Sequence, residues 1–213
     1  MNFVQTIRLL YLLLLSCFSA VLPAWAKDSS PEYPSAVAEL APELRYLNFV
    51  WAVATGDLNG DGVPDVALLM TGSKGDDSPR EERLVVLAGR PDGGFRILSI
   101  SGDFCHPSKF YNLDIRKRSL FVEVVEYADA ARLSSYTLQF RHDAKLNDLA
   151  LIGKEVLAES YEDGALDRIS SNYLSGDSIH TIRKDGRTKS VKERVANKAR
   201  PGLQGSTCDA FLD

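Results

Sequence analysis

Residues 49–71 read FVWAVATGDLNGDGVPDVALLMT, and their pattern is the strongest indication of the fold class. Two short apolar runs, Phe49–Thr55 and Val66–Thr71, flank a turn rich in Asp, Asn and Gly. Short runs of β-branched and aromatic residues bounded by such turns are typical of strands. We therefore expect two strands joined by a polar loop.

Beyond residues 49–71, runs of the same kind recur along the chain at a spacing of about 8–12 residues, separated by Gly, Asp and Asn turns. Some alternate clearly: Leu120, Val122 and Val124 point one way along their run. The pattern predicts an all-β fold of mainly antiparallel sheet, either propeller-blade-like or a sandwich. The further expected strands are Leu84–Ala88, Phe95–Ser101, Arg118–Tyr127, Ser135–His142, Asp148–Ile152, Ile169–Tyr173 and Ile179–Ile182.

The polar turn has the composition of a calcium loop. Counted from its first Asp, oxygen-bearing side chains stand at positions 1, 3, 5 and 9, namely Asp57, Asn59, Asp61 and Asp65. Gly62 permits a sharp turn, and the carbonyl of Val63 supplies a further oxygen. Ca²⁺ takes several hard oxygen ligands in a flexible cage, which favours it over Mg²⁺ here. The alternative is a turn whose carboxylates cap backbone amides.

The loop is not an EF-hand, because Leu68 stands at position 12 where a bidentate Glu is needed. It resembles the loop of FG-GAP and VCBS repeats, the blade motif of integrin α-subunit propellers. The resemblance implies Ca²⁺ held by the side chains of Asp57, Asn59, Asp61 and Asp65 and the Val63 carbonyl. A propeller needs several blades, and the only echo is Glu159–Asp167, which repeats the D-G-x-x-D half.

A second resemblance is to small exported bacterial proteins with one such loop, among them, distantly, the carbapenem intrinsic-resistance periplasmic proteins. The segments that carry it are Gly93–Ile97, Tyr136–Arg141, Leu151–Gly153 and Asn172–Gly176. It implies a small exported β-protein and leaves the function open.

The first 26 residues are of a different kind. Arg8 is their only charged residue, Leu9–Leu22 is almost entirely apolar, and Ala24-Trp25-Ala26 provides small residues for cleavage. These features predict a secretory signal peptide and a periplasmic or secreted protein. An uncleaved anchor and a lipoprotein attached through Cys17 are the alternatives.

The expected organisation after the signal has three parts. A leader, residues 27–44, is mobile over Lys27–Ser35 and has a short helical turn at Ala36–Leu44 near the mature N-terminus. A β-domain with the calcium loop covers residues 45–182. A basic tail covers residues 183–213, and within it Ser190–Ala199 could form a helix.

Two cysteines remain outside the signal, Cys105 and Cys208. In an oxidising compartment they favour a disulfide that ties the tail back, and two separate buried thiols are the alternative.

Residues 183–200 hold eight basic and two acidic residues, a net charge of +6, against −11 for the rest of the mature chain. A solvated tail explains this asymmetry, with steering of an anionic partner as the alternative. No aromatic residues interleave with the charges as in a single-stranded nucleic-acid groove.

The sequence shows no nucleophile elbow, metalloprotease motif or phosphate-binding Gly loop. We therefore expect a non-enzymatic, calcium-stabilised periplasmic or secreted β-protein with a binding or structural role. Its partner would be a protein or a cell-envelope component, with no nucleic acid and no stable membrane insertion. The alternatives are an envelope hydrolase that uses carboxylates brought together by folding, and a protein of antibiotic-resistance or immunity type.

Overall fold

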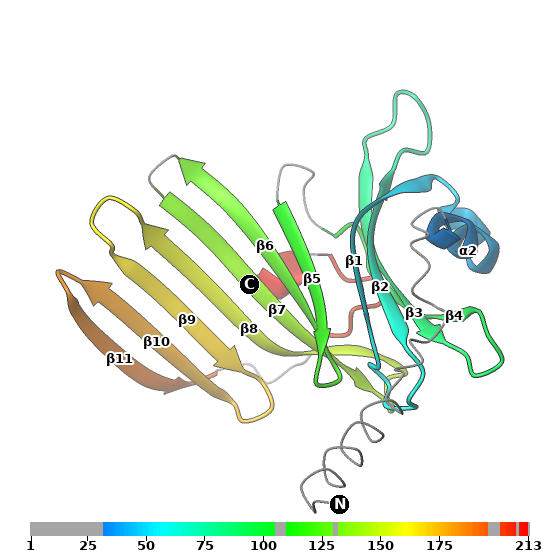
Figure 1. The fold of residues 1–213 in the computed structure, drawn as a ribbon. Coiled ribbons are helices and arrows are strands. Elements are labelled where there is room, and N and C mark those ends of the chain that lie inside the picture. Colours follow the sequence, from blue (N-terminus) through cyan, green and yellow to red (C-terminus); the bar gives the residue numbers. More distant parts are fainter. Residues whose placement is uncertain (1–31, 105–109, 130–131, 196–200, 208, 213) are drawn as a thin grey trace, which may run out of the picture. The chain divides into compact units, whose positions relative to one another are not determined.

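The computed structural model describes residues 32–104, 110–129, 132–195, 201–207 and 209–212. They lie within one structural unit, Glu32–Asp213, built of two antiparallel sheets and short helices (Figure 1). None of the described helices has the length and apolar character of a membrane span. The elements are α2 (Glu32–Leu40), a 3₁₀ turn (Pro42–Leu44), β1 (Leu47–Gly56), β2 (Asp65–Gly72), β3 (Glu81–Gly89), β4 (Phe95–Ile100), β5 (Phe110–Arg116), β6 (Ser119–Asp129), β7 (Arg132–Asp143), β8 (Asp148–Ser160), β9 (Leu166–Asn172), β10 (Asp177–Lys184), β11 (Arg187–Arg194) and α3 (Asp209–Leu212).

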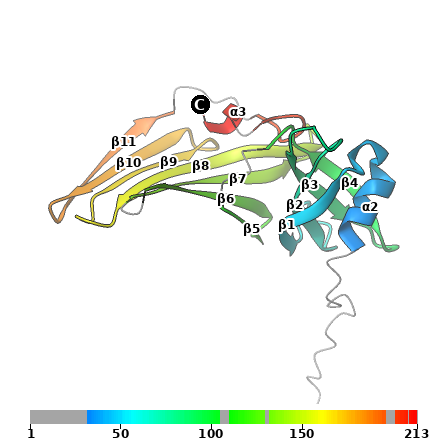
Figure 2. The ribbon, with the colours of Figure 1, turned by 90° about the horizontal axis from the view of Figure 1, so that it is seen from above.

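The first sheet has the strand order β1-β2-β3-β4, the up-and-down arrangement of a propeller blade. Its strand β2 is buried along its whole length. Because side chains alternate across a strand, Ala67 and Leu69 enter one core, while Leu68 and Met70 enter another that includes Val37 of α2. Figure 2 shows α2 beside this sheet. The strand that follows the polar loop is thus held on both faces.

The second sheet has seven strands in the order β11-β10-β9-β8-β7-β6-β5. One of its faces contributes Val122, Val124 and Leu138 to the core that also holds Ala67 and Leu69. The two sheets meet closely at β1 and β5, where a Cβ added to Gly56 would lie 2.5 Å from the Ile115 Cγ2. This contact sets the polar loop beside the β5–β6 turn.

The all-β, mainly antiparallel fold class is confirmed. The strands expected from the sequence coincide with observed strands to within about three residues at each end, except that Asp148–Ile152 covers only the first part of β8, which continues to Ser160. Two strands were missed, β5 and β11.

The N-terminal expectation needs a correction. A short helix does lie there, but α2 begins at Glu32, inside the segment expected to be a mobile leader. Pro34 lies in its first turn, where the absent N–H has no intrahelical partner to lose. Val37, Ala41 and Leu44 are buried against the first sheet, and this packing stabilises the segment as a helix.

The expectation of a helix at Ser190–Ala199 is wrong over the part that the structure describes, because β11 continues to Arg194. The residues between β10 and β11, Asp185 and Gly186, have φ of 50° and 69°. A two-residue hairpin turn with positive φ at both positions matches strand twist, so it sets the register of β11 on β10. The second sheet therefore continues past residue 182 into the basic tail.

Candidate metal centre

The polar loop joins the end of β1 to the start of β2, with Gly56 paired to Asp65 at its base. Gly60 and Gly62 have φ of 82° and 81°, a region that glycine adopts at little cost. These two glycines let the chain turn tightly between the expected ligand side chains.

Side-chain oxygens in the loop accept hydrogen bonds from its own backbone. Asp57 accepts from the amides of Gly60 (2.6 Å) and Gly62 (3.2 Å). Asp61 accepts from the Val63 amide at 2.8 Å, and the Asn59 Oδ1 accepts from the Asp61 amide at 2.8 Å. A carboxylate offers about four lone-pair sites, so these bonds orient the Asp57 and Asp61 groups and leave acceptor capacity unused.

Asp65 is placed differently, since its carboxylate is fully buried. Its Oδ2 accepts from the amides of Leu58 (2.7 Å) and Asn59 (3.2 Å), and its Oδ1 accepts from the Gly89 amide (3.0 Å). Burial raises the pKa of Asp65, and the three amides oppose that rise. Asp65 therefore ties the loop to the end of β3.

The oxygen-rich residues fit a hard cation in type and order. Asn59 and Asp61 are in direct contact, with the Asn59 Nδ2 donating to the Asp61 Oδ2 at 2.8 Å. In the described part of the chain, no three His, Cys, Asp or Glu side chains are grouped as metal ligands, and the Asp65 oxygens face backbone amides. The donors that fit Ca²⁺ are thus Asp57, Asn59 and Asp61 and the Val63 carbonyl, with Asp65 as their anchor.

Two residues beside the loop were missed by the sequence reasoning. A Cβ added to Gly89 would lie 2.2 Å from the Pro64 carbonyl oxygen, so β3 closes on the loop at van der Waals distance. A Cβ added to Gly60 would lie 2.9 Å from the Arg118 guanidinium carbon. Gly89 lies at the end of β3 and Arg118 in the β5–β6 turn. Both are distant in sequence from the loop, and no local motif signals them.

The echo at Glu159–Asp167 forms the end of β8, a turn and the start of β9. Asp167 pairs with Ala158, while Glu159 pairs with Leu166. Glu159 and Asp167 therefore point to opposite faces of the sheet and cannot share one ion.

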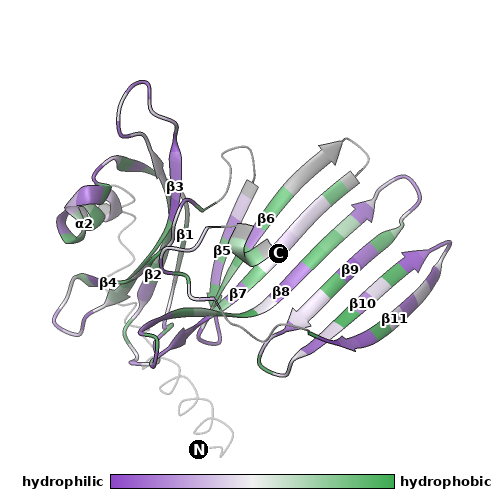
Figure 3. Ribbon diagram, turned by 180° about the vertical axis from the view of Figure 1, so that it is seen from behind, coloured by the Kyte–Doolittle hydropathy of each residue, from purple (hydrophilic) through white to green (hydrophobic). Residues whose placement is uncertain are grey.

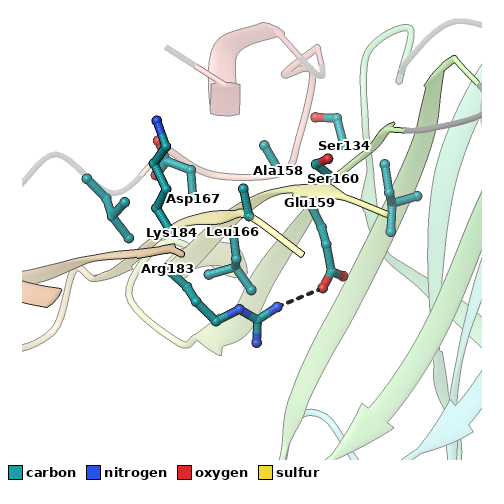
Figure 4. Close-up of a pocket in the computed structure, with 11 residues that line it drawn as sticks. Ser134, Ala158, Glu159, Ser160, Leu166, Asp167, Arg183 and Lys184 are labelled. Atoms are coloured by element: carbon teal, nitrogen blue, oxygen red, sulfur yellow. Dashed lines mark hydrogen bonds and ion pairs between the residues drawn. The ribbon is translucent and has the colours of Figure 1, made fainter. Parts of the chain in front are cut away.

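Glu159 and Asp167 each have a basic partner instead. The Arg183 Nη2 lies 3.1 Å from the Glu159 Oε1 (Figure 4), and the His180 Nε2 lies 2.7 Å from the Asp167 Oδ1. Glu159, Asp167 and Arg183 line a pocket of about 330 Å³ together with Leu166, Ile182 and other residues. The segment is an ion-paired hairpin.

The expected disulfide between Cys105 and Cys208, and Cys17 of the lipoprotein alternative, lie outside the described residues.

Comparison with known proteins gives one family match. The model of the FG-GAP repeat matches residues 49–68, which include β1, the polar loop and the first part of β2. The resemblance expected from the loop is thereby confirmed for this segment. Together with the β architecture, it indicates a β-protein with a binding or structural role.

No curated protein matches the chain. Among solved structures, the chain is similar to the crystal structure of the Vanderwaltozyma polyspora Nup133 β-propeller domain, with 10% identity and a TM-score of 0.28. The match covers 76% of this chain and about half, 52%, of that one.

Proposed function

We propose that this protein is an exported, calcium-stabilised β-protein with a non-enzymatic binding role in the periplasm or outside the cell. The observation that carries the proposal is the arrangement of Asp57, Asn59 and Asp61 on a glycine turn within the FG-GAP match. Hydrogen bonds from loop amides hold their oxygens in place, so a cation would meet ligands that are already ordered.

A cation at this place would act on the fold through β1 and β2. Asp57 and Asp61 carry like charges, which repel one another unless a cation lies between them. The loop closes the hairpin whose second strand, β2, is buried on both faces. A ligand that binds only the folded state adds stability of RT ln(1 + [L]/Kd), about 2.7 kcal/mol at a hundredfold excess over Kd.

Calorimetric titration of the chelator-treated protein with CaCl₂ tests the proposal. We expect one saturable site, a melting temperature that rises with calcium, and loss of both effects in Asp61→Ala. Asp77→Ala, an exposed aspartate in the β2–β3 connection, is the matched control and should bind as the wild type does. Absence of calcium binding together with an unchanged melting temperature in Asp61→Ala would refute the metal assignment.

Export is tested separately by fractionating cells that express the full chain. N-terminal sequencing of the exported protein should begin at Lys27. A Cys17→Ser variant should be processed and located as the wild type is. Recovery of the unprocessed chain in the cytoplasm would refute export, and a membrane-bound form that Cys17→Ser releases would identify a lipoprotein.

A further inference from the structure

The outer face of the second sheet is polar and hollowed. Along β6 and β7, Val122, Val124 and Leu138 enter the core, so Glu123 and Thr137 project from the opposite face. Figure 3 shows this mixture of hydrophobic and hydrophilic residues along the strands. We call this surface the polar face and define it by one row of paired residues across β5–β9: Asn112, Glu123, Thr137, Glu155 and Ser170.

Two adjoining hollows of about 500 and 310 Å³ lie on the polar face. They share Arg116, Phe121 and Thr137, so together they form one groove that crosses the strands. At its floor Gly153 carries no side chain, and a Cβ there would lie 3.1 Å from the Gln139 Oε1. The row of five strands spans about 19 Å at the usual strand spacing, the length of a short linear chain.

The groove lining combines an aromatic ring with hydrogen-bonding groups. The Arg116 guanidinium carbon lies 3.9 Å from the centre of the Phe121 ring. Arg116 is paired with Asp114, and Arg168 with Glu155. The described residues offer the Glu123 carboxylate no hydrogen bond or ion pair.

These features select among ligand classes. The lining holds three carboxylates, from Asp114, Glu123 and Glu155, and three cationic side chains, from Arg116, Lys154 and Arg168. These charges balance, so the groove has no excess positive charge to attract a polyanion such as nucleic acid. Strand backbone groups in the interior of a sheet are paired within it, so an extended peptide lying across the strands gains no backbone pairing. A ligand rich in hydroxyl groups is instead recognised by amide, carboxylate and hydroxyl side chains.

We propose that the polar face binds a neutral oligosaccharide chain that lies across β5–β9. The stacked Arg116–Phe121 pair contacts an apolar face of a sugar, while Glu123 accepts hydrogen bonds from its hydroxyls and Thr137 and Gln139 accept or donate them. This inference deepens the proposed binding role by naming a ligand class and rests on that role. It uses no residue of the calcium loop.

Titration with cellohexaose, chitohexaose and maltohexaose, followed by calorimetry and by amide NMR shifts, tests the proposal. We expect at least one to bind at millimolar concentration, with shifts confined to β5–β9. Phe121→Ala should weaken binding by about threefold to tenfold, the range of one aromatic contact. Thr137→Val and Glu123→Gln, which keep the side-chain shape, should also weaken it.

Leu146→Ala, an exposed apolar residue in the β7–β8 turn, is the control and should bind as the wild type does. The proposal is overturned if none of the three sugars binds, or if Thr137→Val and Glu123→Gln bind like the wild type. Each titration is run with calcium and with chelator. Sugar binding without any calcium binding would refute only the metal assignment, and calcium binding without sugar binding would refute only this inference.

Discussion

Asp65 is more constrained than the other acidic residues of the loop, because it is fully buried and accepts hydrogen bonds from three backbone amides. Asp65→Asn would turn an NH₂ group toward the amide of Gly89 or those of Leu58 and Asn59. We expect it to lower the free energy of unfolding by about 1–3 kcal/mol in the presence of chelator, the cost of an unsatisfied buried donor. Urea denaturation measures this change.

Asp61→Asn is the matched control, since Asp61 is exposed. It should change the calcium-free stability by no more than about 0.5 kcal/mol. An equal loss in both variants would contradict the anchoring role of Asp65.

Glu81 provides a test of pH dependence. A hydrogen bond from Lys74, followed by one from the Tyr46 hydroxyl and the charge of Arg83, lowers the pKa of Glu81 from 4.5 to about 2. Since the folded pKa is depressed, this carboxylate contributes stability above pH 4.5 that is lost as the pH falls toward about 2.

Glu81→Gln should therefore be less stable than the wild type at neutral pH and equal to it near pH 2. Glu162→Gln in the exposed β8–β9 turn should show no such convergence. Denaturant titrations across this range compare the three proteins, and a pH-independent difference for Glu81→Gln would contradict the assignment.

At the residue scale the sequence predicted the loop composition well, because Asp57–Asp65 is a local pattern that needs no tertiary contact. It could not assign Asp65 to a separate role. That role depends on the Gly89 amide, which is brought close only when β3 pairs with β2.

At the scale of elements, β11 shows in physical terms why a strand was missed. All eight residues of β11 are exposed, so no buried face imposes a period of two on its sequence. The helix interpretation failed for this reason, because only Val191 interrupts a run of polar and charged residues.

The β11 edge carries charges that oppose pairing with a second copy. In the full antiparallel register, Arg187 would face Arg194 and Lys189 would face Lys192 of the other copy, and like charges directly opposite are destabilising. We expect Lys192→Glu to increase self-association, measured by sedimentation velocity over a range of concentrations. Lys192→Gln, which removes the charge without reversing it, should associate less than Lys192→Glu. Equal association of the two variants would contradict the conclusion that charge repulsion opposes pairing.

Close packing at the end of the β1–β2 pair opposite the polar loop requires a glycine at position 72. A Cβ added to Gly72 would lie 1.8 Å from the Tyr46 carbonyl oxygen, so the backbone must shift to admit it. We expect Gly72→Ala to lower the melting temperature, with a loss of about 1–3 kcal/mol typical of overpacking. Gly75→Ala is the control, because the added Cβ would have the Ser78 Oγ as its nearest neighbour at 3.6 Å, and it should melt like the wild type. A melting temperature of Gly72→Ala equal to that of the wild type would argue against the close approach.

At the scale of the whole molecule, the described C-terminal residues connect the two sheets. The Gly205 amide donates to the carbonyl of Ile100 at the end of β4, and the Leu203 amide donates to the Leu149 carbonyl of β8. Asp148 supports this connection, accepting from the Ser99 hydroxyl (2.6 Å) and the Gln204 amide (3.0 Å). The sequence predicted a tail tied back through Cys208, which lies outside the described residues. The attachment that the described residues show is non-covalent.

Phe211 of α3 makes the connection testable. Its ring lies 5.1 Å from that of Phe140 on β7, edge to face, and 6.3 Å from that of Phe104. It is buried in the core that both sheets share, so its removal leaves a cavity in contact with both. We expect Phe211→Ala to lower the free energy of unfolding by about 3–5 kcal/mol. Because one core serves both sheets, far-ultraviolet circular dichroism and the fluorescence of Trp51 on β1 should report a single shifted unfolding transition. Two separate transitions would show that the sheets fold independently of this segment.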